Sequence, residues 1–350
     1  MSPRFKSISF VVLRWLLGAL FIFSGAVKCV DPVGTSLYVD KYLAAYGMEF
    51  MLPASLTLAV ALSVVEFTLG VMLVVGYLRR YVAPVVFALV ALFSVVTLLS
   101  ATVLPIGDCG CFGSVIMLEP WMSLLKNLCL LPVAWFVWRG VKDESKEERW
   151  HFAVLGVAMS LPLVVSLYAA AHLPLVDVSP YREGTALRDA VVAEQAMLVD
   201  EGRCVLIFED MATGEVVESE TWLDEGYEYV DARLEFPDVE TTYGDLAFYD
   251  ADGAECSGDV LMRGGRVALL CVNDGDAVDN FGRGIAVLRA AYPDEAIVVL
   301  SAVGDVEAFA GLTTYAVDAL LLRSMIRADV GVIVLNDGDV EFKSHIRDIK

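Results

Sequence analysis

The 350-residue chain has few of the features that mark most soluble enzymes and nucleic-acid-binding proteins. Its three histidines are isolated from one another, and it has neither a phosphate-binding loop nor a dinucleotide-binding glycine fingerprint. Basic residues are scarce, because 25 Lys and Arg stand against 46 Asp and Glu and give a net charge of −21. This acidity disfavours nucleic acid as a partner. The scattered histidines give no metal cluster, and we predict no metal site from them.

Long apolar runs are absent after residue 173 but dominate the part before it. Hydrophobic residues make up 57% of the chain, which is too many for a soluble globular protein. Five runs are long enough to cross a bilayer as helices, which takes about 20 residues, and the rest suffices for one soluble domain. The runs cover residues 8–28, 54–78, 82–104, 120–138 and 150–172.

Charge divides the chain at the same place, with a net +2 in residues 1–172 and −23 in residues 173–350. Lys and Arg cluster before the first run, between the second and third, and between the fourth and fifth, which indicates that these segments are cytoplasmic. With five spans, the amino terminus is then cytoplasmic, and residues 173–350 face outward with the loops at 29–53 and 105–119. In a bacterium this compartment is the periplasm, where disulfide chemistry is normal. We therefore expect a multi-pass inner-membrane protein that contacts the lipid bilayer.

The second outer loop contains the run GDCGCFGS, which places Cys109 and Cys111 one residue apart. The glycines let the backbone turn tightly, and a disulfide across a single residue would be strained and easily exchanged. We predict that Cys109 and Cys111 cycle between dithiol and disulfide. Two other interpretations remain open, a zinc or copper ligand pair and two unrelated thiols.

Four further positions in the membrane half carry chemistry or charge. Cys29 ends the first span beside Lys28, whose charge favours a thiolate, so Cys29 is either a resolving thiol or a small apolar residue at a helix end. Lys28 itself is expected at the outer surface. Glu66 lies in the middle of the second span, where a carboxylate is costly unless it is protonated or partnered. It is a candidate for proton relay or for bonding a quinone head group, or else a neutral carboxyl bonded to a neighbouring helix. Lys126 is expected to snorkel outward, without chemistry.

The run FSGAVKCVDP, the mid-span Glu66 and GDCGCFGS together resemble the DoxX/MauE superfamily of small membrane proteins. The resemblance covers about residues 8–138 and implies a membrane all-α four-helix bundle over residues 1–140, to which residues 150–172 add a fifth transmembrane helix. The MauE branch is linked with disulfide formation in exported proteins, so the resemblance implies a redox-associated role.

The outer part is expected to begin with a linker and a β-rich segment over residues 173–242, in which residues 203–220 form a hairpin. Residues 243–350 read as strand, helix, strand, helix, strand, strand, with residues 305–315 as a helix and turn. This order resembles the α/β thioredoxin-like fold, closest to the redoxin and thiol-disulfide-interchange branch. The whole arrangement is similar to a DoxX-family group found in Bacteroidetes.

Two departures separate this domain from active thioredoxins. The segment that would hold Cys-x-x-Cys reads CVNDGD, with Cys271 inside the strand, and Val330 stands where such proteins have a cis-proline. Thioredoxin-type catalysis by this domain is therefore not expected. We predict a membrane thiol–disulfide relay through Cys109 and Cys111, with an exported thiol protein and a membrane quinone as partners. The alternative is a non-enzymatic assembly factor or binding module whose thioredoxin-like domain recognises a partner.

Overall fold

A computed structural model describes residues 3–349, apart from a set of short segments. These segments are residues 78, 104–109, 116–118, 142–148, 202, 212–215, 220–222, 224–225, 236–240, 245, 275–281, 293–295 and 305–310.

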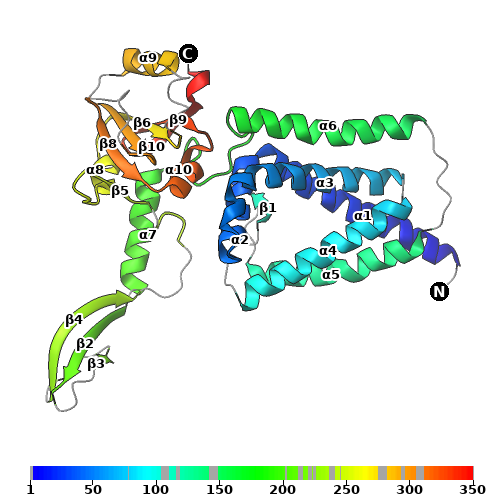
Figure 1. Cartoon of the computed structure of the whole chain (residues 1–350), viewed down its shortest axis with the longest axis horizontal. Coiled ribbons are helices and arrows are strands. Elements are labelled where there is room, and N and C mark those ends of the chain that lie inside the picture. The colour runs from blue at the N-terminus through cyan, green and yellow to red at the C-terminus, as the bar shows by residue number, and fades with distance from the viewer. Residues whose placement is uncertain are drawn as a thin grey trace.

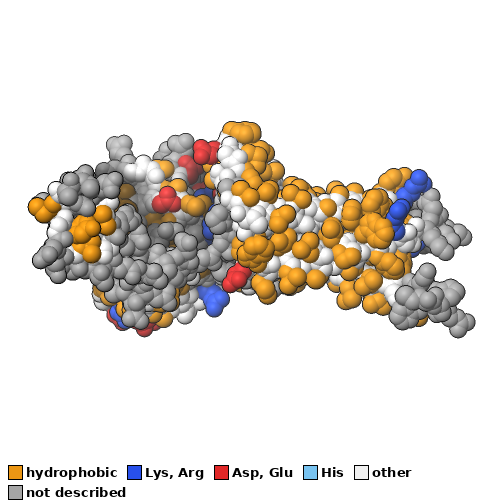
Figure 2. Space-filling view, turned by 90° about the horizontal axis from the view of Figure 1, so that it is seen from below, with side chains coloured by type: hydrophobic (Ala, Val, Ile, Leu, Met, Phe, Trp, Pro, Cys, Tyr) orange, Lys and Arg blue, Asp and Glu red, His pale blue; other side chains and the backbone are white. Residues whose placement is uncertain are grey.

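In the described part of the chain, five helices are long and apolar enough to cross a membrane, as the apolar runs predict. They are α1 (Pro3–Val30), α3 (Ser55–Val75), α4 (Arg79–Thr102), α5 (Pro120–Gly140) and α6 (Arg149–Ala171). Apolar side chains cover the outside of this bundle (Figure 2), as contact with lipid requires. The chain is thus a multi-pass membrane protein.

The bundle is assembled through close helix contacts. Helix α1 packs along α3, α4 packs along α5, and α6 lies against α3 and α1. A Cβ at Gly25 of α1 would lie 2.5 Å from the backbone nitrogen of Phe67, and one at Gly70 of α3 would lie 2.6 Å from the backbone nitrogen of Ile22. Only glycine permits this approach, and small residues are the usual solution where helices meet in lipid.

The outer end of the bundle differs from the expected loop at residues 29–53. Asp31 and Pro32 end α1 as predicted, but they also start α2 (Pro32–Ala45), which is followed by the short 3-10 helix η1 (Glu49–Ala54). The Asp31 side chain accepts a hydrogen bond from the backbone of Gly34, and proline occupies the first turn, which is a favourable helix start. Helix α2 crosses the end of the bundle, between the membrane helices and the C-terminal domain (Figure 1).

The C-terminal domain is built on a six-stranded mixed sheet in the order β10-β9-β6-β7-β8-β5. The neighbouring strands β6, β7 and β8 are parallel, whereas β9, β10 and β5 are antiparallel to their neighbours. Its strands are β5 (Phe248–Tyr249), β6 (Arg266–Val272), β7 (Ile297–Ser301), β8 (Thr313–Val317), β9 (Val330–Asn336) and β10 (Asp339–His345). This α/β arrangement is thioredoxin-like, as predicted. The expected turn at the end of residues 305–315 is wrong, because Thr313–Tyr315 belong to the extra strand β8; residues 305–310 lie outside the described part.

Helices cover both faces of this sheet. One face packs against α8 (Ser257–Leu261), α10 (Ala319–Ile326) and the start of α7 (Leu187–Glu201). The other packs against α9 (Gly282–Ala291) and the 3-10 helix η5 (Ile346–Asp348). The linker after α6 is tied to β10, because the buried Lys343 Nζ bonds Asp177 Oδ2 at 2.6 Å and Ser179 Oγ at 3.2 Å.

A separate three-stranded antiparallel sheet in the order β3-β2-β4 extends away from the body of the domain beyond α7 (Figure 1). It consists of β2 (Arg203–Asp210), β3 (Val216–Ser219) and β4 (Tyr227–Glu235). The pairing of β2 with β3 confirms the hairpin predicted for residues 203–220.

Candidate functional site

The cysteine-containing loop is anchored at the outer end of the bundle by the short strand β1 (Cys111–Ser114), which contacts α1 and α2. Gly110 precedes this strand with a φ of 60°, and a Cβ there would lie 2.6 Å from Cγ of Tyr38 on α2. Both the left-handed backbone and the close approach of the tyrosine ring require glycine at this position.

Cys111 is disulfide-bonded. Cys109, its predicted partner, lies outside the described residues. Among the other cysteines whose side chains the structure describes, Cys29, Cys129, Cys256 and Cys271 are free.

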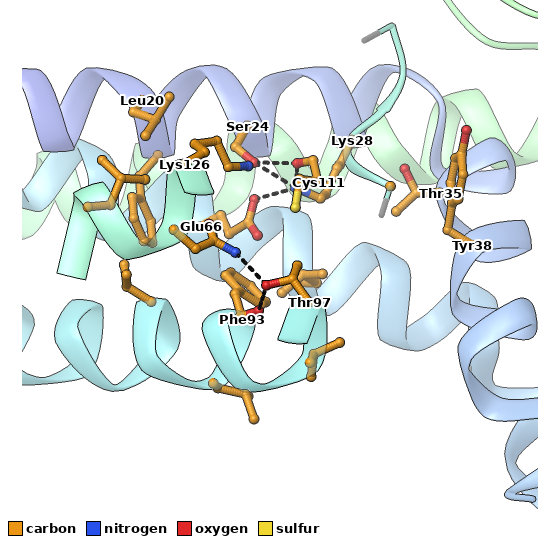
Figure 3. A pocket seen from close by; sticks show the side chains of 18 of the residues that line it. Leu20, Ser24, Lys28, Thr35, Tyr38, Glu66, Phe93, Thr97, Cys111 and Lys126 are labelled. Carbon is orange, nitrogen blue, oxygen red and sulfur yellow. Dashed lines mark hydrogen bonds and ion pairs between the residues drawn. The ribbon is translucent and has the colours of Figure 1, made fainter. Parts of the chain in front are cut away.

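The backbone of Cys111 is held by a polar cluster formed by Ser24, Lys28 and Glu66 (Figure 3). Lys28 Nζ donates to the carbonyl oxygen of Cys111 at 2.6 Å, to Ser24 Oγ at 2.6 Å and to Glu66 Oε2 at 2.7 Å. Ser24 Oγ also donates to the Cys111 carbonyl oxygen, at 2.9 Å. Three acceptors therefore occupy the three N–H groups of the Lys28 ammonium.

The expectation that Lys28 lies at the outer surface is wrong. The side chains of Lys28 and Glu66 are each only 3% exposed, since α2 and β1 close over the end of α1. Glu66 has the partner that a mid-span carboxylate needs, and this partner is Lys28 on the neighbouring helix α1. A buried pair of this kind is tolerable only when further hydrogen bonds satisfy the charges, and Ser24 and the Cys111 carbonyl provide them.

Cys29 is buried but does not belong to this cluster. Its Sγ donates to the carbonyl oxygen of Ala26 at 3.1 Å. Cys29 also does not line the cavity that lies beside the polar cluster. One residue along a helix turns a side chain by about 100°, so Cys29 and Lys28 point in different directions. Its role as a resolving thiol stays a prediction.

A cavity of about 200 Å³ lies beside the polar cluster, enclosed by α1, α2, α3, α4 and α5. Lys28, Glu66 and Cys111 line it together with Lys126, and apolar residues such as Phe93 make up most of the remaining wall (Figure 3). The combination of an apolar wall with a few convergent polar groups is typical of small-molecule sites.

The expectation that Lys126 snorkels outward missed this cavity and its neighbour Asn127. Both residues line it, and Asn127 Nδ2 donates to Thr97 Oγ1 on α4 at 3.3 Å. Lys126 points toward Ser24 inside the bundle in Figure 3. The sequence contained a signal for this site, because an ionisable residue such as Lys126 inside a membrane span is by default a functional candidate.

The described part of the C-terminal domain contains two free cysteines, the half-buried Cys256 and the buried Cys271, and neither stands in a disulfide. Burial and the nearby carboxylates of Asp250 and Asp259 raise the pKa of the Cys256 thiol. Cys271 is fully buried in β6, and burial raises the pKa of its thiol to about 12, an effect that the nearby Lys343 only partly opposes. Asn273, which follows β6, bonds the backbone of Ala328 and Asp329. A buried thiol of this kind is inert toward disulfide exchange.

This domain is docked on the bundle through α10 and α2. Arg323 donates to Asp40 Oδ2 at 3.1 Å and to Ser36 Oγ at 3.0 Å. Arg327 Nε lies 3.3 Å from Asp31 Oδ2, with both side chains at most 6% exposed. Arg327 adopts a left-handed φ of 57°, which a non-glycine residue holds only when its surroundings fix it.

Comparison with known proteins gives the most direct support to the interpretation of the membrane half. Residues 6–139 match the family described as methylamine utilisation protein MauE, which confirms the resemblance to the DoxX/MauE superfamily in this region. The chain is also similar to protein TlpB of Flavobacterium psychrophilum, with 27% identity over 167 residues. The match covers 45% of this chain and 43% of that relative, so the chain spans less than half the length of the relative. No solved structure matches the chain.

Proposed function

We propose that this protein is a membrane thiol–disulfide oxidoreductase that passes electrons from an exported thiol protein to a membrane quinone. One observation carries the proposal. The disulfide-bonded Cys111 lines a cavity inside the bundle, and the same cavity contains the buried Lys28–Glu66 pair. We assign Cys109 as the disulfide partner of Cys111.

The donor half of the reaction is disulfide exchange. A thiolate of the exported protein attacks the Cys109–Cys111 disulfide, and a second thiol of that protein resolves the mixed disulfide. The donor is oxidised by two electrons and becomes a disulfide, while Cys109 and Cys111 become thiols. Cys29 is a candidate shuttle thiol, which would resolve a mixed disulfide on Cys109 or Cys111.

The acceptor half restores the disulfide. The two thiols form the S–S bond again, and their two electrons and two protons reduce a quinone to a quinol. The cavity volume of about 200 Å³ is below the roughly 300–1,000 Å³ of pockets that enclose a whole drug-sized ligand. We therefore expect the cavity to hold the quinone ring alone. The isoprenoid tail would then leave between the helices toward lipid. Lys28 and Glu66 supply a hydrogen-bonded route for protons at the cavity wall.

The proposed orientation places this chemistry on the periplasmic side of a bacterial inner membrane. It follows from Arg79, Arg139 and Arg149, which lie at the ends of α4, α5 and α6 away from α2 and the cysteine loop. A reporter that is active only outside the cytoplasm should be active when fused to the carboxyl terminus and inactive when fused between α5 and α6. The reverse pattern would refute the orientation.

Thiol trapping of the purified full-length protein across a series of redox potentials tests the relay. We expect Cys109 and Cys111 to interconvert between dithiol and disulfide, and we expect Cys109→Ser and Cys111→Ser to abolish quinone reduction by a dithiol donor. Cys256→Ser removes a free thiol in the other domain and should change neither readout. If the cysteine pair never changes redox state, the relay is wrong.

A second candidate function is a non-enzymatic assembly factor. The buried Cys271 and the docked α10 favour it, because a thioredoxin-like domain whose core-strand thiol is buried can still recognise a partner. In that case the disulfide of Cys111 is structural. The double replacement of Cys109 and Cys111 by serine would then leave cellular function intact in a protein that still folds.

A further inference from the structure

Two arginines come together at the end of the bundle that lies away from α2. Arg14, on α1, is only 9% exposed, and Arg79 is the first residue of α4. Their guanidinium groups are close enough for the two charges to repel each other. Nε of Arg14 and Nε of Arg79 are both buried, and neither has a hydrogen-bond partner.

The described residues place no carboxylate at this end to balance the two charges. In the described part of the membrane half, the carboxylates lie either mid-span or at the opposite end, next to α2: Glu66, Asp31, Asp40, Glu49 and Glu119. A charge that is held out of water without an opposite charge is costly. The arginine pair therefore favours an anion that comes from outside the described chain.

Arg14 reaches the turn that joins α3 to α4. Gly76 ends α3 with a left-handed φ of 81°, and a Cβ at this position would overlap Nη1 of Arg14. Glycine thus leaves the space that the guanidinium occupies. The next residue, Tyr77, is buried and stacks on His151 of α6 with 4.6 Å between the ring centroids. The two arginines therefore meet beside the start of α4, and a helix start attracts anions through its free N–H groups.

The pair lies at the depth of the lipid head groups. Trp138 and Trp150, at the ends of α5 and α6 nearest the pair, are 40% and 48% exposed, and such aromatic side chains are typical of the membrane interface. Arg14 lies roughly 9 Å along α1 from Ile8, where the apolar span begins. Helical side chains lean toward the helix N-terminus, which brings the guanidinium back toward the interface. Figure 2 shows Lys and Arg side chains where the apolar surface ends.

We propose that Arg14 and Arg79 bind the phosphate group of an anionic phospholipid at the turn between α3 and α4. Guanidinium groups suit this role, because their planar set of donors matches the oxygens of a phosphate. A zwitterionic phospholipid brings its own cationic group close to the arginines and binds more weakly. The bound lipid ties α1 to the start of α4. This inference is independent of the proposed redox function.

The test uses the full-length protein in micelles of a neutral detergent. The probes are phosphatidylglycerol, phosphatidylcholine with the same acyl chains, and inorganic phosphate. Native mass spectrometry should retain phosphatidylglycerol in preference to phosphatidylcholine, and phosphatidylglycerol should give the higher Tm, because a ligand that binds only the folded protein stabilises it. Arg14→Gln and Arg79→Gln should each weaken phosphatidylglycerol binding at least ~10-fold, which is the effect of losing one charge-assisted hydrogen bond.

Arg139→Gln is the matched control. Arg139 lies at the same end of the bundle, is exposed, and has its guanidinium carbon 5.5 Å from the ring centroid of Trp135. The control removes the same charge from the interface, and its affinity for phosphatidylglycerol should stay within about twofold of wild type. If Arg14→Gln does not fold, Arg14→Lys keeps the charge but loses the planar set of donors, and it should also weaken the binding.

The preference between the two lipids separates lipid binding from simple packing. If Arg14→Gln changes Tm equally in phosphatidylglycerol and phosphatidylcholine, Arg14 has only a structural role and the proposal is wrong. A wild-type protein that does not distinguish the two lipids contradicts it as well, because the chain then satisfies both arginines by itself. If inorganic phosphate raises Tm and phosphatidylglycerol does not, the pair binds free phosphate and a lipid is refuted as its occupant. Thiol trapping of Cys109 and Cys111 tests the redox function separately, so either proposal can fail without the other.

Discussion

We predict that the free energy of unfolding depends strongly on the buried Lys28–Glu66 pair. Replacing Glu66 with Gln keeps the shape of the side chain but leaves the Lys28 ammonium, which is 3% exposed, without an opposite charge. Removing one partner of a buried ion pair costs about 3–5 kcal/mol. We expect Glu66→Gln to lower the free energy of unfolding by that amount.

A double-mutant cycle isolates the pair from other effects of each substitution. Lys28→Met removes the ammonium and leaves the carboxylate buried alone, so it should cost a similar amount. In the double variant Lys28→Met/Glu66→Gln no charge is left uncompensated, and the loss should be clearly smaller than the sum of the two single losses. Reversible unfolding in mixed detergent micelles measures all three variants. Lys41→Met, at an exposed position on α2, should change stability by about 0.5 kcal/mol or less.

The same substitutions report on the redox loop. Lys28→Met also removes a hydrogen bond to the Cys111 carbonyl, so the strand that carries the disulfide should loosen and an impermeant reductant should reduce the disulfide faster. Two results would refute the reasoning: a Glu66→Gln variant within about 1 kcal/mol of wild type, or a double variant that loses as much as the two single variants combined.

Three further predictions concern the helix packing, the domain contact and the C-terminal thiol. Gly25→Ala should destabilise the bundle by about 1–3 kcal/mol or more, because the new methyl group would meet the backbone of α3, whereas Gly156→Ala meets nothing within 4 Å and should be neutral in the same unfolding assay. Asp31→Asn preserves a good helix start for α2 but discharges the contact with Arg327, so spin-label distances between α2 and α10 should broaden; an unchanged distance distribution would show that the ion pair does not hold the domains together. Cys271, with a pKa raised to about 12, has a thiolate fraction of roughly 10⁻⁴ at pH 8, so iodoacetamide should label it only after unfolding, and rapid labelling of the native protein would contradict its burial.

The membrane topology could be predicted from the sequence because it depends on local properties. Each apolar run is as long as a bilayer requires, and each lies between polar segments, so α1, α3, α4, α5 and α6 follow from hydropathy alone. The thioredoxin-like sheet was recognisable for a similar reason, since β6, β7 and β9 are short, buried, β-branched runs. The extra strand β8 was missed because Thr313–Val317 is too short and too mixed in polarity to show a period.

The site itself depends on contacts between residues that are distant in the sequence. The burial of Lys28 requires that β1 and α2 close over the end of α1, and a single sequence does not reveal that closure. Lys28 is 83 residues from Cys111, and Arg323 is 283 residues from Asp40. The sequence showed that Glu66 needed a partner, but the identity of the partner came from the fold.

Helix α2 links the two halves of the protein physically. Its N-cap Asp31 contacts Arg327 of the C-terminal domain, and four residues later Thr35 begins the cavity lining, which continues along α2 to Tyr42. Tyr38 in turn packs on Gly110 beside the disulfide-bonded Cys111. A domain whose described cysteines, Cys256 and Cys271, form no disulfide is thus attached to the helix that forms one wall of the proposed redox cavity. We expect this domain to act on the proposed cavity through its position, because Arg323 and Arg327 hold α2 and Tyr38 of α2 packs on the Cys111 loop.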